Sequence, residues 1–313
     1  MTRYVDVADM QQLVLHHGLA RMMTEMAEHI RADFVRWGGC HPFSHSAAQA
    51  CGVLADATTG HPTLVGELQI TRALCTAATS ALAAKALARR NSRSMALIGN
   101  GALSEFQAIA FITQLGISEL RVFDVDRRAT DKLVANLAPY VQQGAVRIVR
   151  AASIREAVRG ADIVTTLTAD KANATILTDD LVAPGMHLNA VGGDAPGKTE
   201  LQPSILLRSK VFVEYAPQAR LNGELQQMPL DFEIHELWKV LARQQPGRYN
   251  AQQVTLFDSV GFALEDVSAL RYIHTLSQKL GIGSTAYLVP ALSDAKNLFA
   301  FATAARPALR QAA

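Results

Sequence analysis

The chain has 313 residues, of which 49% are hydrophobic and 19% charged, and its formal net charge is +2. This length predicts one or two globular domains that are stable without disulfides or structural metals. The small, dispersed charge does not favour binding to nucleic acid or to an anionic membrane. No apolar run approaches the ~18 residues that cross a bilayer, and the N-terminus lacks the apolar segment of a signal peptide.

The cysteines and histidines of the chain predict a reducing compartment and no metal. Cys40, Cys51 and Cys75 form an odd set without C-x-x-C spacing, so we interpret them as reduced thiols of a cytoplasmic protein. His41 and His45 stand in a segment that reads as a loop, where two isolated histidines are more typical of the surface than of a metal site.

The first part of the chain predicts helices joined by an irregular segment. Apolar residues recur at helical spacing over residues 20–36, and an alanine-rich helix is expected over residues 68–90. Residues 40–66 are interrupted by prolines and glycines and predict a loop with short strands.

From Ser94 onward, short apolar strands alternate with helices. This alternation predicts an α/β fold with a Rossmann-type doubly wound parallel sheet. We expect residues 81–284 to form the dinucleotide-binding domain, and residues 1–80 plus 285–313 to form a second α+β domain for substrate binding and dimerisation. The expected strands are residues 94–99, 119–126, 145–151, 161–168, 186–193, 210–216 and a last strand from residue 254, with helices at 104–115, 128–141, 153–160 and a long closing helix.

A glycine-rich stretch, "ALIGNGALSEF", follows the first of these strands and opens a helix. Gly99 permits a tight turn, Gly101 permits close approach to a pyrophosphate, and Ser104 is small enough for the helix to pack on the strand. The helix N-terminus then offers unpaired N–H groups to phosphates. The stretch predicts a dinucleotide site, the alternative being a tight turn without a nucleotide.

An acidic residue supports the dinucleotide interpretation. Asp124 lies 25 residues after Gly99 and ends the second strand, where a carboxylate binds the adenosine ribose hydroxyls. A carboxylate there favours NAD over NADP, although Arg127 and Arg128 follow it and could weaken that preference.

The stretch "HLNAVGGDAPGKTEL" places Asp194 after a strand and two glycines. Ligands of parallel sheets bind at the carboxyl ends of the strands, and Gly192 and Gly193 would allow a nicotinamide to approach the backbone. We therefore expect Asp194 to be a catalytic acid whose pKa is raised by a desolvated pocket. The alternative is an N-cap of a helix beginning at Pro196.

Several stretches together resemble the ornithine cyclodeaminase/mu-crystallin superfamily, and ornithine cyclodeaminases in particular: "MALIGNGALSEFQAIAF", "TTLTADKANATI", "GMHLNAVGGDAPGKTEL", "VFVEYAPQARLNGELQQ" and "VTLFDSVGFALEDVSALRY". The resemblance covers residues 67 to 290. It implies a homodimer that converts L-ornithine to L-proline and ammonia, with a bound NAD that accepts and returns a hydride. It implies a catalytic role for Asp194, a substrate contact at Val260, and cofactor contacts at Ala102, Leu103, Thr168, Val191, Gly192, Gly193, Lys198 and Ser259. The implied role is in proline biosynthesis and ornithine catabolism.

The chain departs from this family where the substrate carboxylate should bind. The family has an arginine in an R-T-A-A-x-S stretch that reads "CTAATS" here, so Cys75 replaces it. Arg72 lies one helical turn earlier and is the candidate substitute, displaced by ~5 Å.

A second departure is a shorter segment after Trp37. It lacks roughly 35 residues of a strand-rich region, enough for three or four strands, that carries further substrate-binding side chains in the family. These departures leave two alternatives open: an inactive or ligand-binding member of the family, or a lysine cyclodeaminase or cyclic imine reductase.

Overall fold

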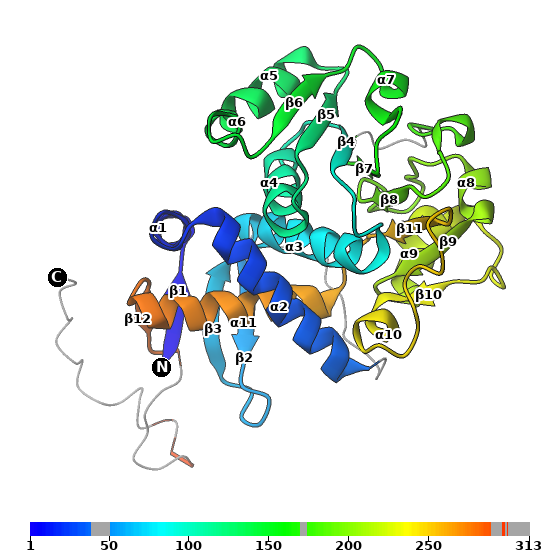
Figure 1. Ribbon diagram of the computed structural model, residues 1–313. Helices are drawn as coiled ribbons and strands as arrows, with labels where there is room; N and C mark the ends of the chain where they lie inside the picture. Colours follow the sequence, from blue (N-terminus) through cyan, green and yellow to red (C-terminus); the bar gives the residue numbers. More distant parts are fainter. Residues whose placement is uncertain (39–50, 170–173, 289–295, 298, 300–313) are drawn as a thin grey trace.

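The computed structural model describes residues 1–38, 51–169, 174–288, 296–297 and 299 (Figure 1). His41, His45 and Cys40 lie outside the described residues. The larger of two sheets has eight strands in the order β10-β9-β11-β8-β7-β4-β5-β6, with every pair parallel. Its strands are β4 (Ser94–Ile98), β5 (Glu119–Phe123), β6 (Arg147–Arg150), β7 (Ile163–Thr166), β8 (His187–Ala190), β9 (Ser209–Val213), β10 (His235–Glu236) and β11 (Val254–Asp258). The doubly wound sheet predicted from the sequence is thereby confirmed.

Strand β4 is the point at which the order of strands reverses. The chain runs from β4 outward to β5 and β6, then crosses to β7 on the other side of β4. A crevice forms at the carboxyl ends of the strands at such a reversal, and ligands of open α/β sheets bind there. The glycine loop, which follows β4 directly, therefore lies in that crevice.

Both faces of the central strands β4, β7, β8, β9 and β11 are buried, which explains why these strands read as continuous apolar runs. Along β4, Met95 and Leu97 join one hydrophobic cluster, whereas Ala96 and Ile98 join the cluster on the opposite face. The helices that join the strands of this sheet are α4 (Ser104–Leu115), α5 (Arg127–Asn136), α6 (Ala138–Gln142), α7 (Ile154–Val158), α8 (Pro203–Arg208), α9 (Ala216–Asn222) and α10 (Leu237–Leu241), with 3-10 turns η1 (Asp179–Leu181) and η2 (Glu224–Gln227).

One predicted helix is divided in the structure. The sequence predicts a single helix over residues 128–141, but α5 ends at Asn136 and α6 begins at Ala138. Pro139 explains the break, because it has no N–H to donate to the preceding turn and its ring clashes with the carbonyl group there.

The smaller sheet joins the two ends of the chain. It contains β12 (Ser284–Ala286), β1 (Thr2–Val5), β3 (Pro62–Glu67) and β2 (Cys51–Ala55), in that order. Strand β1 pairs in parallel with β3 and antiparallel with β12, so the chain near residue 285 does return to the N-terminal part. The sequence does not predict β1, because its four residues are too few to show a periodicity.

Helix α11 (Ala263–Leu280) lies across this smaller sheet, and two further long helices pack on α11 (Figure 1). These are α2 (Leu19–Trp37) and α3 (Gln69–Leu87), which also pack on each other, and the shorter α1 (Val7–His17) precedes them. Helix α3 follows β3 of the smaller sheet in the chain and packs on β8 and β11 of the larger one. Among the described residues no helix is long and apolar enough to cross a membrane. The predicted boundaries of the dinucleotide-binding domain, at residues 81 and 284, stay a prediction.

Candidate functional site

The crevice beside β4 contains a cavity of about 320 Å³. Its lining includes four of the predicted cofactor residues: Gly99, Gly101, Asp124 and Thr168. Gly99 has a φ of +92°, and a Cβ there would lie 2.7 Å from the Leu167 carbonyl oxygen, so no other residue fits. At Gly101 nothing lies within 4 Å of an added Cβ, which leaves open space directly above the backbone. These residues fit the phosphates of a dinucleotide.

Asp124 and Ser104 brace the glycine loop. The Asp124 carboxylate follows β5 and accepts hydrogen bonds from the Asn100 amide at 2.5 Å and the Asp126 amide at 2.8 Å. Ser104 begins α4, and its hydroxyl donates to the Gly101 carbonyl oxygen at 2.7 Å. The small residue predicted at this position thus also makes a specific hydrogen bond within the loop.

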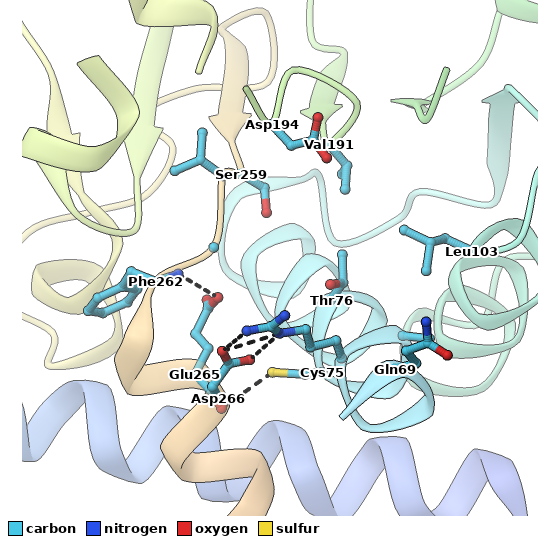
Figure 2. Close-up of a pocket in the computed structure, with 14 residues that line it drawn as sticks. Gln69, Cys75, Thr76, Leu103, Val191, Asp194, Ser259, Phe262, Glu265 and Asp266 are labelled. Atoms are coloured by element: carbon cyan, nitrogen blue, oxygen red, sulfur yellow. Dashed lines mark hydrogen bonds and ion pairs between the residues drawn. The ribbon is translucent and has the colours of Figure 1, made fainter. Parts of the chain in front are cut away.

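A second cavity, also of about 320 Å³, lies at the carboxyl ends of β8 and β11, facing α3 and the first turn of α11 (Figure 2). It brings together residues that are far apart in the sequence and that sequence reasoning assigned to the cofactor, the chemistry and the substrate. Those lining residues are Arg72, Leu103, Val191, Asp194, Ser259 and Val260. Leu103 belongs to the glycine loop, so this cavity adjoins the dinucleotide crevice.

Asp194 lies in the loop after β8 and lines this cavity. Its side chain is 62% exposed, and its Oδ1 accepts a hydrogen bond from the buried Lys198 ammonium at 3.0 Å. The desolvated environment that we expected around this carboxyl group is therefore not observed. No helix begins here, since α8 starts only at Pro203, and the alternative of a helix N-cap does not apply.

The two glycines before Asp194 have a reason that the sequence did not reveal. A Cβ at Gly192 would lie 2.1 Å from Glu200 Oε1, and one at Gly193 would lie 3.0 Å from Glu224 Oε1. Buried carboxyl groups thus occupy the space beside both backbones. Four predicted cofactor residues line neither cavity: Ala102, Gly192, Gly193 and Lys198.

Arg72 reaches the cavity but is already paired. Its Nε and Nη2 donate to the Asp266 carboxylate, with a shortest distance of 2.7 Å (Figure 2). Cys75, at the position where the sequence resemblance implies an arginine, is buried, and its thiol lies 3.5 Å from the Glu265 carbonyl oxygen. Burial raises the pKa of the Cys75 thiol, so it carries no charge that could bind a substrate.

Sequence reasoning missed a layer of buried acids beneath the site. Glu200 accepts from the Thr168 amide and hydroxyl at 2.7 and 2.6 Å and from the Gly192 amide at 3.0 Å. Glu224 accepts from the Glu200 and Leu201 amides at 2.7 and 3.1 Å. These carboxyl groups connect the loops that follow different strands, and they fix the backbone on which both cavities are built.

Burial is the main cause of the pKa shifts in this layer. It raises the pKa of Glu224 to about 8, with the charge of Asp258 contributing. It raises the pKa of Asp258 to about 7 and that of Glu214 to about 7. For Glu214 and Asp258 the sequence did contain a signal of a buried acid, because each ends an apolar strand, in "VFVE" and "TLFD".

Fold and site together define an α/β protein with a dinucleotide-type crevice and an adjoining small-molecule cavity at the carboxyl ends of a doubly wound sheet. The profile of the ornithine cyclodeaminase/mu-crystallin family matches residues 16–279. The ornithine cyclodeaminase of Brucella melitensis is 46% identical over 316 aligned positions, covering 89% of this chain and 87% of the relative. That of Agrobacterium tumefaciens is 47% identical over 307 positions, covering 86% and 85%. The chain belongs to the ornithine cyclodeaminase/mu-crystallin family.

Solved structures show the same fold at low sequence identity. A lysine cyclodeaminase has a TM-score of 0.83 at 24% identity and covers 96% of this chain and 99% of its own. An archaeal alanine dehydrogenase dimer with bound NAD has a TM-score of 0.80 at 23% identity, covering 92% and 99%. The Brucella alignment is longer than the portion of this chain that it covers, so the relative contains residues without a counterpart here.

Proposed function

We propose that this protein is an NAD-dependent ornithine cyclodeaminase that forms L-proline and ammonia from L-ornithine. The observation that carries the proposal is the cavity that brings Leu103 of the glycine loop, Asp194 and Arg72 together. The 46% identity to an ornithine cyclodeaminase over most of the chain supports the same reaction.

The crevice fits NAD by its own features. Gly99 and Gly101 leave room for a pyrophosphate at the N-terminus of α4, and the Asp124 carboxylate favours the ribose hydroxyls of NAD over the 2′-phosphate of NADP. When bound, this cofactor supplies a hydride acceptor and donor.

Asp194 is our candidate for the group that moves protons between the two substrate amines. It lines the cavity at its solvent-facing side, and Lys198 holds one of its oxygens at 3.0 Å. Among the described residues the other oxygen makes no hydrogen bond, and we propose that it binds a substrate amine. Such a positioned carboxylate contributes roughly 10²–10⁴-fold to the rate of a proton transfer.

Arg72 is our candidate for binding the substrate carboxylate. Asp266 uses its Nε–Nη2 edge, and among the described residues Nη1 makes no hydrogen bond. A guanidinium group held on one edge by an aspartate can present its other edge to a second carboxylate. Val260, in the same lining, would contact the substrate chain.

The wider biological setting follows from the same proposal. An ornithine cyclodeaminase serves proline biosynthesis and ornithine catabolism, and we propose that it does so here as a cytoplasmic homodimer. Support for the dimer comes from the smaller sheet, whose described edge strand β2 is left open to a partner.

The test is to incubate the pure protein with catalytic NAD⁺ and L-ornithine, L-lysine or L-arginine, and to measure ammonia and the cyclic product. We expect ammonia and proline from ornithine, and a loss of about 10²–10⁴-fold in kcat for Asp194→Asn. An Asp194→Asn variant with full activity would refute the role assigned to this carboxylate.

A second candidate function is a ligand-binding member of the family without turnover. The neutralisation of Arg72 by Asp266 and the uncharged Cys75 favour it. It predicts tight NADH binding with no ammonia from any basic amino acid. A lysine cyclodeaminase would prefer lysine in the same assay, and a cyclic imine reductase would consume NADH, whereas cyclodeamination leaves the amount of NADH unchanged.

A further inference from the structure

One wall of the substrate cavity is held by a carboxyl group that is not in the cavity lining. Residues 259–262 follow β11 and form this wall. The Ser259 hydroxyl donates to Glu214 Oε1 at 2.7 Å, and the Val260 and Gly261 amides donate to Glu214 Oε2 at 3.0 and 2.7 Å. Three consecutive residues of the wall are thus bound to a single side chain.

The burial of Glu214 is energetically unfavourable if the residue has only a structural role. It directly follows β9 and is completely buried. Transfer of a carboxyl group from water to such a place is unfavourable unless hydrogen bonds replace its hydration. The hydrogen bonds that it accepts from backbone amides and from a hydroxyl group all come from the cavity wall, which indicates that the position of this wall is what the residue secures.

A second buried acid lies beside it. Glu265, in the first turn of α11, is 6% exposed, and its Oε2 accepts from the Phe262 amide at 3.4 Å. Its Oε1 has no hydrogen-bond partner among the described residues. Two neighbouring buried carboxyl groups cannot both be charged, so the pair retains a proton. Burial and the neighbouring charge of Glu214 raise the pKa of Glu265 well above its usual range.

We propose that Glu214 is a positioning residue that orients the Ser259 oxygen as a hydrogen-bond acceptor for an N–H donor bound in the cavity. Because the Ser259 proton is directed to Glu214, the oxygen can only accept from a ligand. The matching ligand chemistry is a substrate amine or the carboxamide of the cofactor. The identity of these ligands rests on the proposed function, whereas the hydrogen bonds of Glu214 do not.

Three variants test the proposal in the full-length protein loaded with NAD⁺. Glu214→Gln keeps the volume but replaces an acceptor oxygen with a donor amide, and Ser259→Ala removes the oriented oxygen. The control is Asp162→Asn, which lies at the opposite end of the strands and also loses a carboxylate that binds backbone amides, those of Arg93 and Ser94 at 2.8 and 3.0 Å.

For Glu214→Gln and Ser259→Ala we expect the affinity for ornithine or for NAD⁺ to fall about 10-fold or more, and we expect no such change for the control. A rise in KM for ornithine at unchanged NAD⁺ affinity identifies the substrate amine as the donor. A rise in the Kd for NAD⁺ identifies the carboxamide. If Glu214→Gln changes neither constant by more than Asp162→Asn does, the proposal is wrong.

A measurement that needs no turnover separates this inference from the proposed function. Hydrogen exchange of the Val260 and Gly261 amides should be about 10-fold or more faster in Glu214→Gln than in the wild type, and unchanged in Asp162→Asn. Unchanged exchange in Glu214→Gln overturns the inference. Absence of ammonia from the wild type with every basic amino acid overturns the proposed function instead.

Discussion

Gly192→Ala should destabilise the protein only because Glu200 is present. The new methyl group would lie 2.1 Å from Glu200 Oε1, so the carboxylate must leave its place. It would then lose its hydrogen bonds to the Thr168 amide, the Thr168 hydroxyl and the Gly192 amide. Hydrogen bonds to a charged group contribute about 1.5–3 kcal/mol each, so we expect Gly192→Ala to lower the free energy of unfolding by about 4 kcal/mol or more.

A double-mutant cycle measures this dependence. Glu200→Ala loses the same three hydrogen bonds and should be destabilised by a similar amount. In the double variant the methyl group introduced by Gly192→Ala occupies the vacated space, so its stability should equal that of Glu200→Ala alone. The coupling free energy, from urea unfolding followed by tryptophan fluorescence, should therefore be about 4 kcal/mol. If the two effects add within ~0.5 kcal/mol, the steric explanation for this glycine is wrong.

Further predictions concern the glycine loop, the buried acids and the thiols. Gly101→Ala places its methyl group in open space, so calorimetry should show an unchanged thermal midpoint but NAD⁺ affinity lowered at least about tenfold. Burial raises the pKa of Glu224 from 4.5 to about 8, so between these pH values the folded state keeps a proton that the unfolded state releases. The free energy of unfolding should therefore fall as the pH rises from 4.5 to about 8, and Glu224→Gln should flatten the dependence of the urea midpoint on pH. In a Cys40→Ser background, a thiol reagent should modify exposed Cys51 rapidly and buried Cys75 only on unfolding; rapid modification of both thiols would contradict the burial of Cys75.

The sequence alone predicted most elements of the large sheet, because each carries a local signal. The run "SMALI" followed by Gly99 and a helix is readable as strand, turn and helix wherever it occurs, since backbone geometry restricts these residues to few conformations. The expected helix at 104–115 matches α4, whereas the sequence does not predict β1 or β10. Strands of four and two residues depend on their pairing partners and carry no periodicity of their own.

The sequence also placed Asp194 at the end of a strand, and the tertiary structure decided its surroundings. That Lys198 pairs with it, that it lines one cavity together with Arg72, and that Asp266 holds Arg72 are contacts between side chains up to 194 positions apart. The buried acids illustrate the same limit. A glutamate after an apolar strand is an ambiguous signal in one dimension, because its neutralisation depends on amide donors supplied by loops from elsewhere in the chain. Local residue chemistry therefore determined where the strands and loops would form, and only the packing of distant segments decided which charges they bury.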